Sequence, residues 1–205
     1  VAELAPTERA AAFRLTYPEK EMSYLVVDAY SGGHVEVLPD RNMIAGYSTA
    51  NHGGVAGNFR NWFVVVSDTP FETRTTDGHI AMVGFKTAKG QKVNLRVASS
   101  FISHEQAEIN LKELGDRTLD EIAQAGRARW NEVLGRIAVE DGNLDNLRTF
   151  YSCLYRSVLF PRDLSEINAD GERVHYSPYD GAVHKGYLFA DTGFWDTFRC
   201  LFPLL

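Results

Sequence analysis

The feature that most constrains the fold of this chain is a change of hydrophobic period at Ser103. Before it, apolar residues alternate with polar ones at period two, as in Phe13, Leu15 and Tyr17, which is typical of half-buried β-strands. After it, apolar residues recur every three or four positions, which is typical of helices packed along one face. The chain of 205 residues therefore passes from an all-β part to an all-α part.

The β part contains short apolar segments separated by clusters of turn-forming residues. Two continuous apolar runs, 25–27 and 64–66, are strand signals. Glycine, proline, asparagine and aspartate gather between the segments at intervals that suit an antiparallel meander. The pattern predicts about seven strands packed face to face as a β-sandwich.

The helical part begins with two capping signals. Ser103–Gln106 and Thr118–Glu121 each have the spacing of a capping box, in which the first side chain and the fourth satisfy each other's backbone N–H groups. The apolar spacing predicts helices over 103–115, 118–137 and 144–160, the last ended by a proline. A further helix is expected to begin near Thr192.

Between Pro161 and Thr192 no period persists for about thirty residues, which is longer than ordinary connections and favours a binding loop. Aromatic and acidic side chains interleave through its second half and beyond. They are Tyr176, Tyr179, Asp180, His184, Tyr187, Phe189, Asp191, Phe194, Trp195 and Asp196. Sugars suit this mixture, because their C–H faces stack on aromatic rings and their hydroxyls donate to carboxylates. The same aromatics would also pack the end of a helical domain, so both interpretations stay open.

The charge and the apolar runs exclude some classes of function. A formal net charge of -6 argues against a nucleic-acid partner, whose proteins usually present a basic face. No apolar run is long enough for a membrane span, and the first residues lack the pattern of a signal peptide. The two cysteines, Cys153 and Cys200, lie in apolar helical contexts and are expected to be buried free thiols.

Two groups of residues could be considered as metal ligands, but the spacing of each along the chain argues against a metal site. His175, His184, Asp180 and Asp191 lack the close spacing that would pre-position zinc ligands. Asn168–Glu172 has the start of a calcium loop, but it lacks the later glutamate, so a plain β-turn is favoured. No metal ligand is assigned within this chain.

Collinear motifs along most of the chain resemble the family 92 glycoside hydrolases, which are calcium-dependent exo-α-mannosidases. The strongest is Trp195–Leu205 with the preceding Thr192–Phe194, which is similar to the family's Trp-Asp-Thr helix. Weaker similarities occur at 58–71, 101–111, 130–134 and 150–162.

The resemblance implies an α+β, multi-domain fold. Residues 1–102 would form an antiparallel β-sandwich, 103–142 a helical linker, and 143–205 the first hairpin of an (α/α)6 barrel. The implied activity is calcium-dependent release of terminal α-linked mannose with inversion, with α-1,2 linkages expected. The implied substrate is a mannose-capped oligosaccharide or N-glycan, and the implied location is extracellular or periplasmic.

The resemblance places only part of the active site in this chain. Asp196 matches the family's substrate-contacting aspartate, with Trp195 beside it as a wall or stacking surface, and Arg162 and Tyr179 are further candidates for the same pocket. The catalytic acid Glu, the base Asp and the calcium ligands are expected beyond Leu205. We therefore expect the 205-residue chain alone to be inactive.

Two other classes of function fit the same residues. The first is a non-catalytic sandwich that binds sugar through residues 1–102, with Trp62 as a contact. The second is an accessory domain of another enzyme built from a sandwich and an α/α barrel, such as a phosphorylase, because several chemistries share that architecture.

Overall fold

The computed structural model describes residues 1–51 and 53–204, with every side chain in these ranges except those of Phe194 and Asp196. Up to Ser100 it contains one short 3-10 helix, η1 (Pro39–Arg41), and nine strands. The strands are β1 (Ala2–Pro6), β2 (Ala10–Thr16), β3 (Lys20–Asp28), β4 (His34–Leu38), β5 (Met43–Ser48), β6 (Asn61–Ser67), β7 (Thr73–Asp77), β8 (Ile80–Thr87) and β9 (Lys92–Ser100).

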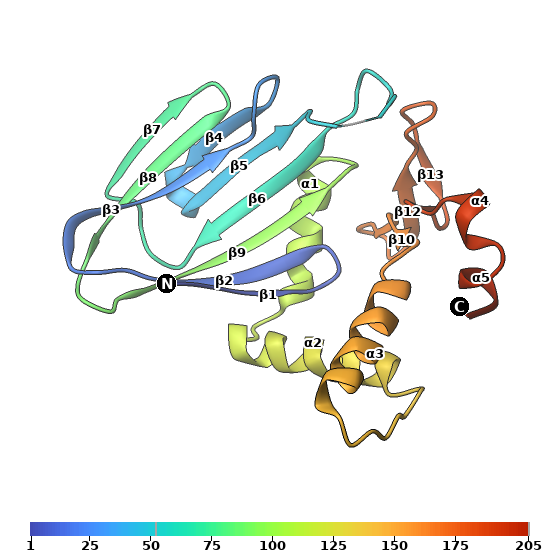
Figure 1. The fold of residues 1–205 in the computed structure, drawn as a ribbon. Coiled ribbons are helices and arrows are strands. Elements are labelled where there is room, and N and C mark those ends of the chain that lie inside the picture. Colours follow the sequence, from blue (N-terminus) through green and yellow to red (C-terminus); the bar gives the residue numbers. More distant parts are fainter. Residues whose placement is uncertain (52, 205) are drawn as a thin grey trace.

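The nine strands form two antiparallel sheets that pack face to face (Figure 1). The larger sheet has the order β1-β2-β9-β6-β5-β4, and the smaller has the order β3-β8-β7. The predicted sandwich is confirmed, with nine strands where the pattern suggested about seven. One reason for the difference is β7, which is fully exposed and contains no apolar residue, so it carries no alternation.

Each face of the six-stranded sheet has its own core. The core between the sheets is formed by Ala29, Val35, Ile44, Val65, Ala81, Val83, Phe85, Val93 and Leu95. On the opposite face, small side chains such as Ala10, Ala12 and Ala98 pack against Leu114 and Ile122. Those two residues belong to a layer of helices made of α1 (His104–Asn110), η2 (Leu111–Leu114) and α2 (Leu119–Leu134).

The capping signals locate these helices correctly. Thr118 and Glu121 form a complete capping box at the start of α2. Ser103 caps α1 by accepting from the Gln106 N–H at 3.1 Å, but the Gln106 side chain does not return to Ser103. It donates instead to Asn110 Oδ1 and to the Ile167 carbonyl. Half of the first predicted box is thus replaced by a long-range contact.

After α2 the chain forms α3 (Leu144–Ser157), as predicted, and then a segment that differs from the expected aperiodic loop. It contains five strands of two to four residues, too short to establish a period. They are β10 (Arg162–Asp163), β11 (Glu166–Ile167), β12 (Arg173–Tyr176), β13 (Val183–Lys185) and β14 (Phe189–Ala190). β11, β12 and β13 form one small sheet, and β10 pairs with β14.

The last predicted helix is divided into α4 (Phe194–Thr197) and α5 (Leu201–Leu204). Pro203 explains the break, because its ring would clash with the Arg199 carbonyl in one continuous helix. Restarting at Leu201 puts the proline in a first turn, where it is tolerated.

The expectation of buried thiols is wrong, since both Cys153 and Cys200 are exposed. The surroundings of the two cysteines explain this exposure. Cys153 lies on α3, which has no buried residue, and Cys200 directly precedes α5, in which no described residue is buried. Among the described residues, no helix combines the length and the hydropathy that crossing a membrane requires.

Candidate functional site

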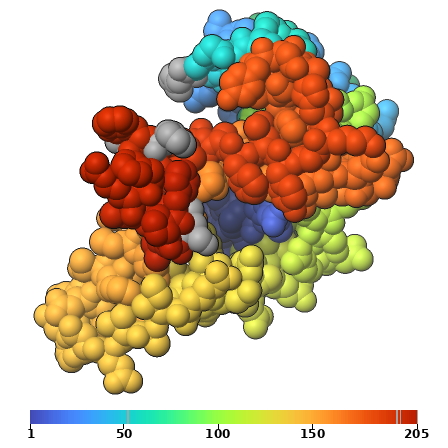
Figure 2. Space-filling view, turned by 90° about the vertical axis from the view of Figure 1, so that its right-hand side faces the viewer, coloured from blue at the N-terminus to red at the C-terminus, as the bar shows by residue number. Residues whose placement is uncertain are grey.

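The aromatic and acidic side chains singled out from the sequence lie on the segment from β10 to α4, beside the sandwich (Figure 1). Figure 2 shows a recess on this face of the molecule. Its borders are the C-terminal helices, the small β-structure before them and the region of α3, and the first residues of the chain appear at its floor.

The sequence-predicted site residues are only partly brought together. Trp195 lies on α4 with 85% of its surface exposed, and Tyr179 lies in the β12–β13 turn with 90% exposed. Arg162 on β10 donates through Nε to Asp191 Oδ2 at 2.6 Å, which joins two residues of the predicted group across the β10–β14 pair. The side chain of Asp196 lies outside the described residues.

A second polar pair lies in the β12–β13 turn. Asp180 Oδ1 accepts from the Ala182 N–H at 3.0 Å, and Oδ2 lies 2.8 Å from His184 Nε2. These contacts, the backbone N–H first, hold the pKa of Asp180 well below its usual value. The neighbouring His175 ring faces His184 with 5.9 Å between centroids.

No metal centre emerges from these groups. In the part of the chain that the structure describes, no set of three or more His, Cys, Asp or Glu side chains is arranged to hold a metal ion. These residues therefore offer no calcium site of their own, and the resemblance places the calcium ligands beyond Leu205. The Asn168–Glu172 segment forms the predicted β-turn, with Asn168 Oδ1 accepting from the backbone of Asp170 and Glu172.

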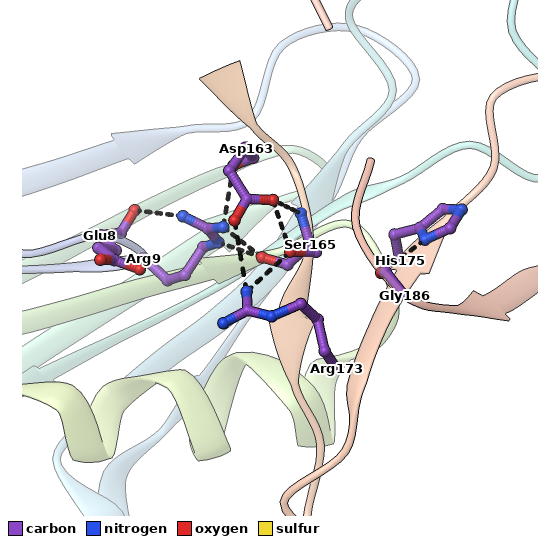
Figure 3. Close-up of polar contacts among 7 residues, drawn as sticks. All are labelled: Glu8, Arg9, Asp163, Ser165, Arg173, His175 and Gly186. Atoms are coloured by element: carbon purple, nitrogen blue, oxygen red, sulfur yellow. Dashed lines mark hydrogen bonds and ion pairs between the residues drawn. The ribbon is translucent and has the colours of Figure 1, made fainter. Parts of the chain in front are cut away.

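A partly buried polar network attaches the small β-structure to the sandwich (Figure 3). Arg9, in the turn between β1 and β2, donates to the carbonyl oxygens of Asp163 and Ser165, both at 2.9 Å. From the other side, Arg173 donates to Ser165 Oγ at 2.9 Å and to Asp163 Oδ2 at 3.3 Å. Two arginines from distant parts of the chain thus hold the same short loop.

Arg173 also orients an aromatic pair. Its guanidinium carbon lies 4.3 Å from the centroid of the Tyr187 ring, a cation–π distance. Tyr187 in turn stacks on Phe189, with centroids 5.6 Å apart and ring planes 7° from parallel. Both rings are more than half exposed, so the pair leaves apolar ring surface open to solvent.

Two further contacts fix this region on the sandwich. Glu166, only 3% exposed, accepts from the Phe101 N–H at 2.9 Å and from Asn110 Nδ2 at 2.6 Å. Asn58 donates to the Gly181 carbonyl at 2.8 Å and accepts from the Tyr176 hydroxyl at 2.9 Å. Because a buried carboxylate is costly without donors, the Glu166 contacts define the position of β11.

Sequence reasoning missed Arg9, Glu166, Asn110 and Arg173. Arg9 and Glu166 meet partners 156 and 65 residues away along the chain, so no local motif signals them. The partners of Arg173 are 10 and 8 residues away, but they follow no helix or strand period. Trp62, the ring named for a sandwich that binds sugar by itself, packs edge-on against Tyr47 with centroids 4.9 Å apart and is partly buried. It is not a free stacking surface.

The chain thus folds as a β-sandwich joined by helices and polar contacts to a segment rich in aromatic and carboxylate side chains, which is the order of parts that the resemblance to a glycoside hydrolase family implied. Comparison with known families agrees: residues 1–112 match the N-terminal domain of glycosyl hydrolase family 92, and residues 106–205 match its catalytic domain. The chain belongs to glycosyl hydrolase family 92, as the motifs around Trp195 indicated.

Solved structures and a curated relative are similar to this chain. The inverting family 92 mannosidase BT2199 of Bacteroides thetaiotaomicron is 43% identical, with a TM-score of 0.91, over 98% of this chain and 30% of its own. The α-mannosidase BT3965 of the same organism, in complex with mannoimidazole, shares the fold at 22% identity, with a TM-score of 0.81, over 99% of this chain and 30% of its own.

The curated relative is an uncharacterized secreted glycosidase of Arthroderma benhamiae. It is 34% identical over 108 residues, which is 47% of this chain and 14% of the relative. The chain thus spans less than a third of the length of each of these three proteins.

Proposed function

We propose that this chain is the N-terminal portion of an enzyme that releases terminal α-linked mannose from glycans with inversion. The observation that carries the proposal is the similarity, over 98% of the chain, to an inverting mannosidase at 43% identity. The substrate would be a mannose-capped oligosaccharide or N-glycan, with α-1,2 linkages preferred. Binding of mannoimidazole by a protein of the same fold supports a mannose-shaped pocket.

In this proposal the chain supplies substrate-holding groups. Inversion needs a general acid and a general base with carboxyl groups roughly 6.5 to 9.5 Å apart, and both are expected beyond Leu205. Asp196 would accept hydroxyls of the terminal mannose, and the exposed Trp195 ring would form a wall of its pocket. Calcium dependence also belongs to the proposal, with ligands expected beyond Leu205.

Arg162 and Tyr179 have supporting roles. The ion pair with Asp191 fixes the Arg162 guanidinium while leaving its side chain 61% exposed, so it has N–H groups to offer to sugar hydroxyls. In the described part of the chain the Tyr179 hydroxyl has no hydrogen-bond partner, and a substrate hydroxyl would fit that role. An extracellular or periplasmic location is supported by the secreted relative.

The test is an assay of the protein expressed from its complete reading frame. Hydrolysis of α-1,2-linked mannobiose, followed by proton NMR, should show β-mannose as the first product, and a chelator should stop it. Release of α-mannose first, or no release of mannose, overturns the proposal. The 205-residue chain alone should show no turnover.

Variants separate the roles within the site. Asp196→Asn and Trp195→Ala should lower kcat/KM by about a hundredfold or more, because each removes a contact to the reacting sugar ring. Trp130→Ala, on α2, is the matched control, since its ring packs on Tyr155 with centroids 4.6 Å apart instead of facing a sugar. Equal losses in Trp195→Ala and Trp130→Ala would contradict the assigned role of Trp195.

A further inference from the structure

The helix-facing side of the six-stranded sheet changes chemistry along its strands. Since side chains alternate between faces, Ala12 and Arg14 of β2 lie on the same face as Arg96 and Asn94 of β9, their cross-strand partners. The helices cover this face where Ala10, Ala12 and Ala98 are buried. Further along the same strands the face becomes polar and cationic.

A pocket lies where the helix cover ends. It has a volume of about 460 Å³ and is bounded by this polar part of the sheet and by the first turn of α2. The volume is within the range of small-molecule sites in proteins. Val66 and Leu119 give the pocket an apolar part, and charged side chains form much of the rest of its wall.

The charges in this pocket are predominantly positive, although the whole chain carries a net charge of -6. Four cationic side chains and two carboxylates line the pocket. The cationic ones are Arg14, Lys92, Arg96 and Arg117, and the carboxylates are Asp68 and Asp120.

Both carboxylates already have donors. Asp120 accepts two hydrogen bonds from Arg14, at 2.9 and 3.0 Å, and Arg14 also binds Glu3. Asp68 accepts from the Asn94 side chain at 2.6 Å and from the Asn94 N–H at 3.0 Å. Arg14 is therefore shared by two carboxylates, and Asp68, held by neutral donors, keeps its negative charge opposite the other three cations.

Those three cations have no carboxylate partner among the described residues. Arg96 donates to the Gly115 carbonyl, and Arg117 donates to the carbonyls of Leu114, at 3.2 Å, and of Glu113. Carbonyl oxygens hold these guanidinium groups in place without cancelling their charge. Lys92, at the start of β9, adds a third positive charge to the same wall.

We propose that this pocket binds the phosphoryl group of a phosphorylated sugar, at a site separate from the aromatic segment between β10 and α4. Fixed guanidinium groups bind phosphate oxygens in pairs, and a nearby ammonium adds charge without a strict geometry. The volume leaves room beyond the phosphoryl group, and the apolar side chains offer a surface for the C–H face of a sugar ring. The site binds and carries out no reaction.

Calorimetric titration of the protein from its complete reading frame tests this with mannose 6-phosphate, inorganic phosphate and mannose as separate ligands. We expect mannose 6-phosphate to bind, more tightly than inorganic phosphate, and mannose not to bind at this site. Equal affinity for the two phosphates overturns the sugar part of the proposal and assigns the pocket to free phosphate. Absence of binding by both phosphates overturns the site itself.

Charge-neutralising variants locate the binding. Arg117→Gln and Lys92→Gln should each weaken the affinity for mannose 6-phosphate about tenfold, which corresponds to the loss of one charge-assisted contact. Arg136→Gln and Lys89→Gln, which remove the same charges outside the pocket, should leave it unchanged. Lys92→Gln removes no hydrogen bond within the described residues, so it remains informative if Arg117→Gln disturbs the fold. Losses of equal size in the control variants would overturn the assignment.

Discussion

The sandwich and the C-terminal segment from α3 onward are held in place by different forces. The sandwich has two apolar cores, with Ile44, Val83 and Phe85 fully buried. In α3, by contrast, no residue is buried, and the buried side chains of β11 and β12 include the carboxylate Glu166. The sandwich is therefore stabilised by non-directional burial, whereas directional hydrogen bonds fix the segment that carries the candidate site.

This difference has a functional consequence. A site held by hydrogen bonds to a rigid partner keeps its geometry only while those few contacts are intact. Arg9, Glu166 and Asn58 provide these contacts, and they connect the two matched domains of the family. The sandwich thus acts as a platform for the candidate site.

The largest expected effect is in the apolar core of the sandwich. Phe85→Ala should lower the free energy of unfolding by about 3–5 kcal/mol, because a fully buried ring that contacts Tyr17 and Phe71 would leave a cavity. Urea denaturation followed by circular dichroism measures this change. Tyr24→Ala, a half-exposed ring on β3, is the control, with an expected change within about 0.5 kcal/mol. Similar losses in both variants would contradict the assigned core.

The next effect concerns the polar attachment. Glu166→Ala should cost about 2–3 kcal/mol, because it leaves the Phe101 N–H buried without an acceptor and removes one of the two acceptors of Asn110 Nδ2, which keeps only the Ser99 carbonyl. Hydrogen exchange should then be faster in β11 and β12 while the amides of β6 stay protected.

The control for this prediction lies on the same small sheet. Glu172 pairs with exposed Lys185 at 2.6 Å, and Glu172→Ala should cost less than about 1 kcal/mol. If exchange rises equally over the sandwich and the small sheet in Glu166→Ala, the two regions unfold as one unit and the comparison fails.

The same comparison explains what the sequence could predict. Alternation and capping boxes are local, so the sandwich, α2 and α3 were predictable within a few residues. The short strands around Arg173 and Phe189 have no period of their own, and Glu166 meets donors that are 56 and 65 residues away. The Trp-Asp-Thr motif still indicated the family, because a family motif can be recognised in a segment whose hydrophobic pattern does not predict its secondary structure.

The smallest effect is expected at the exposed β12–β13 turn, where acidification should weaken one contact. The pKa of Asp180 is lowered, chiefly by the Ala182 N–H and then by His184 and Ser177, so its folded value lies below the unfolded value. The stabilisation is therefore complete above the unfolded pKa of about 3.9 and is lost as the pH falls towards the folded value.

Exchange of the Ala182 amide, measured by NMR, checks this expectation. Asp180→Asn should speed exchange modestly at pH 7, and the difference from the wild type should shrink below about pH 4, because the carboxylate of the opened turn then takes up a proton while that of the closed turn stays ionised. Asp170→Asn, in the turn between β11 and β12, is the control and should leave Ala182 unchanged. A difference between Asp180→Asn and wild type that stays constant from pH 7 to pH 2 would show that charge does not hold this turn.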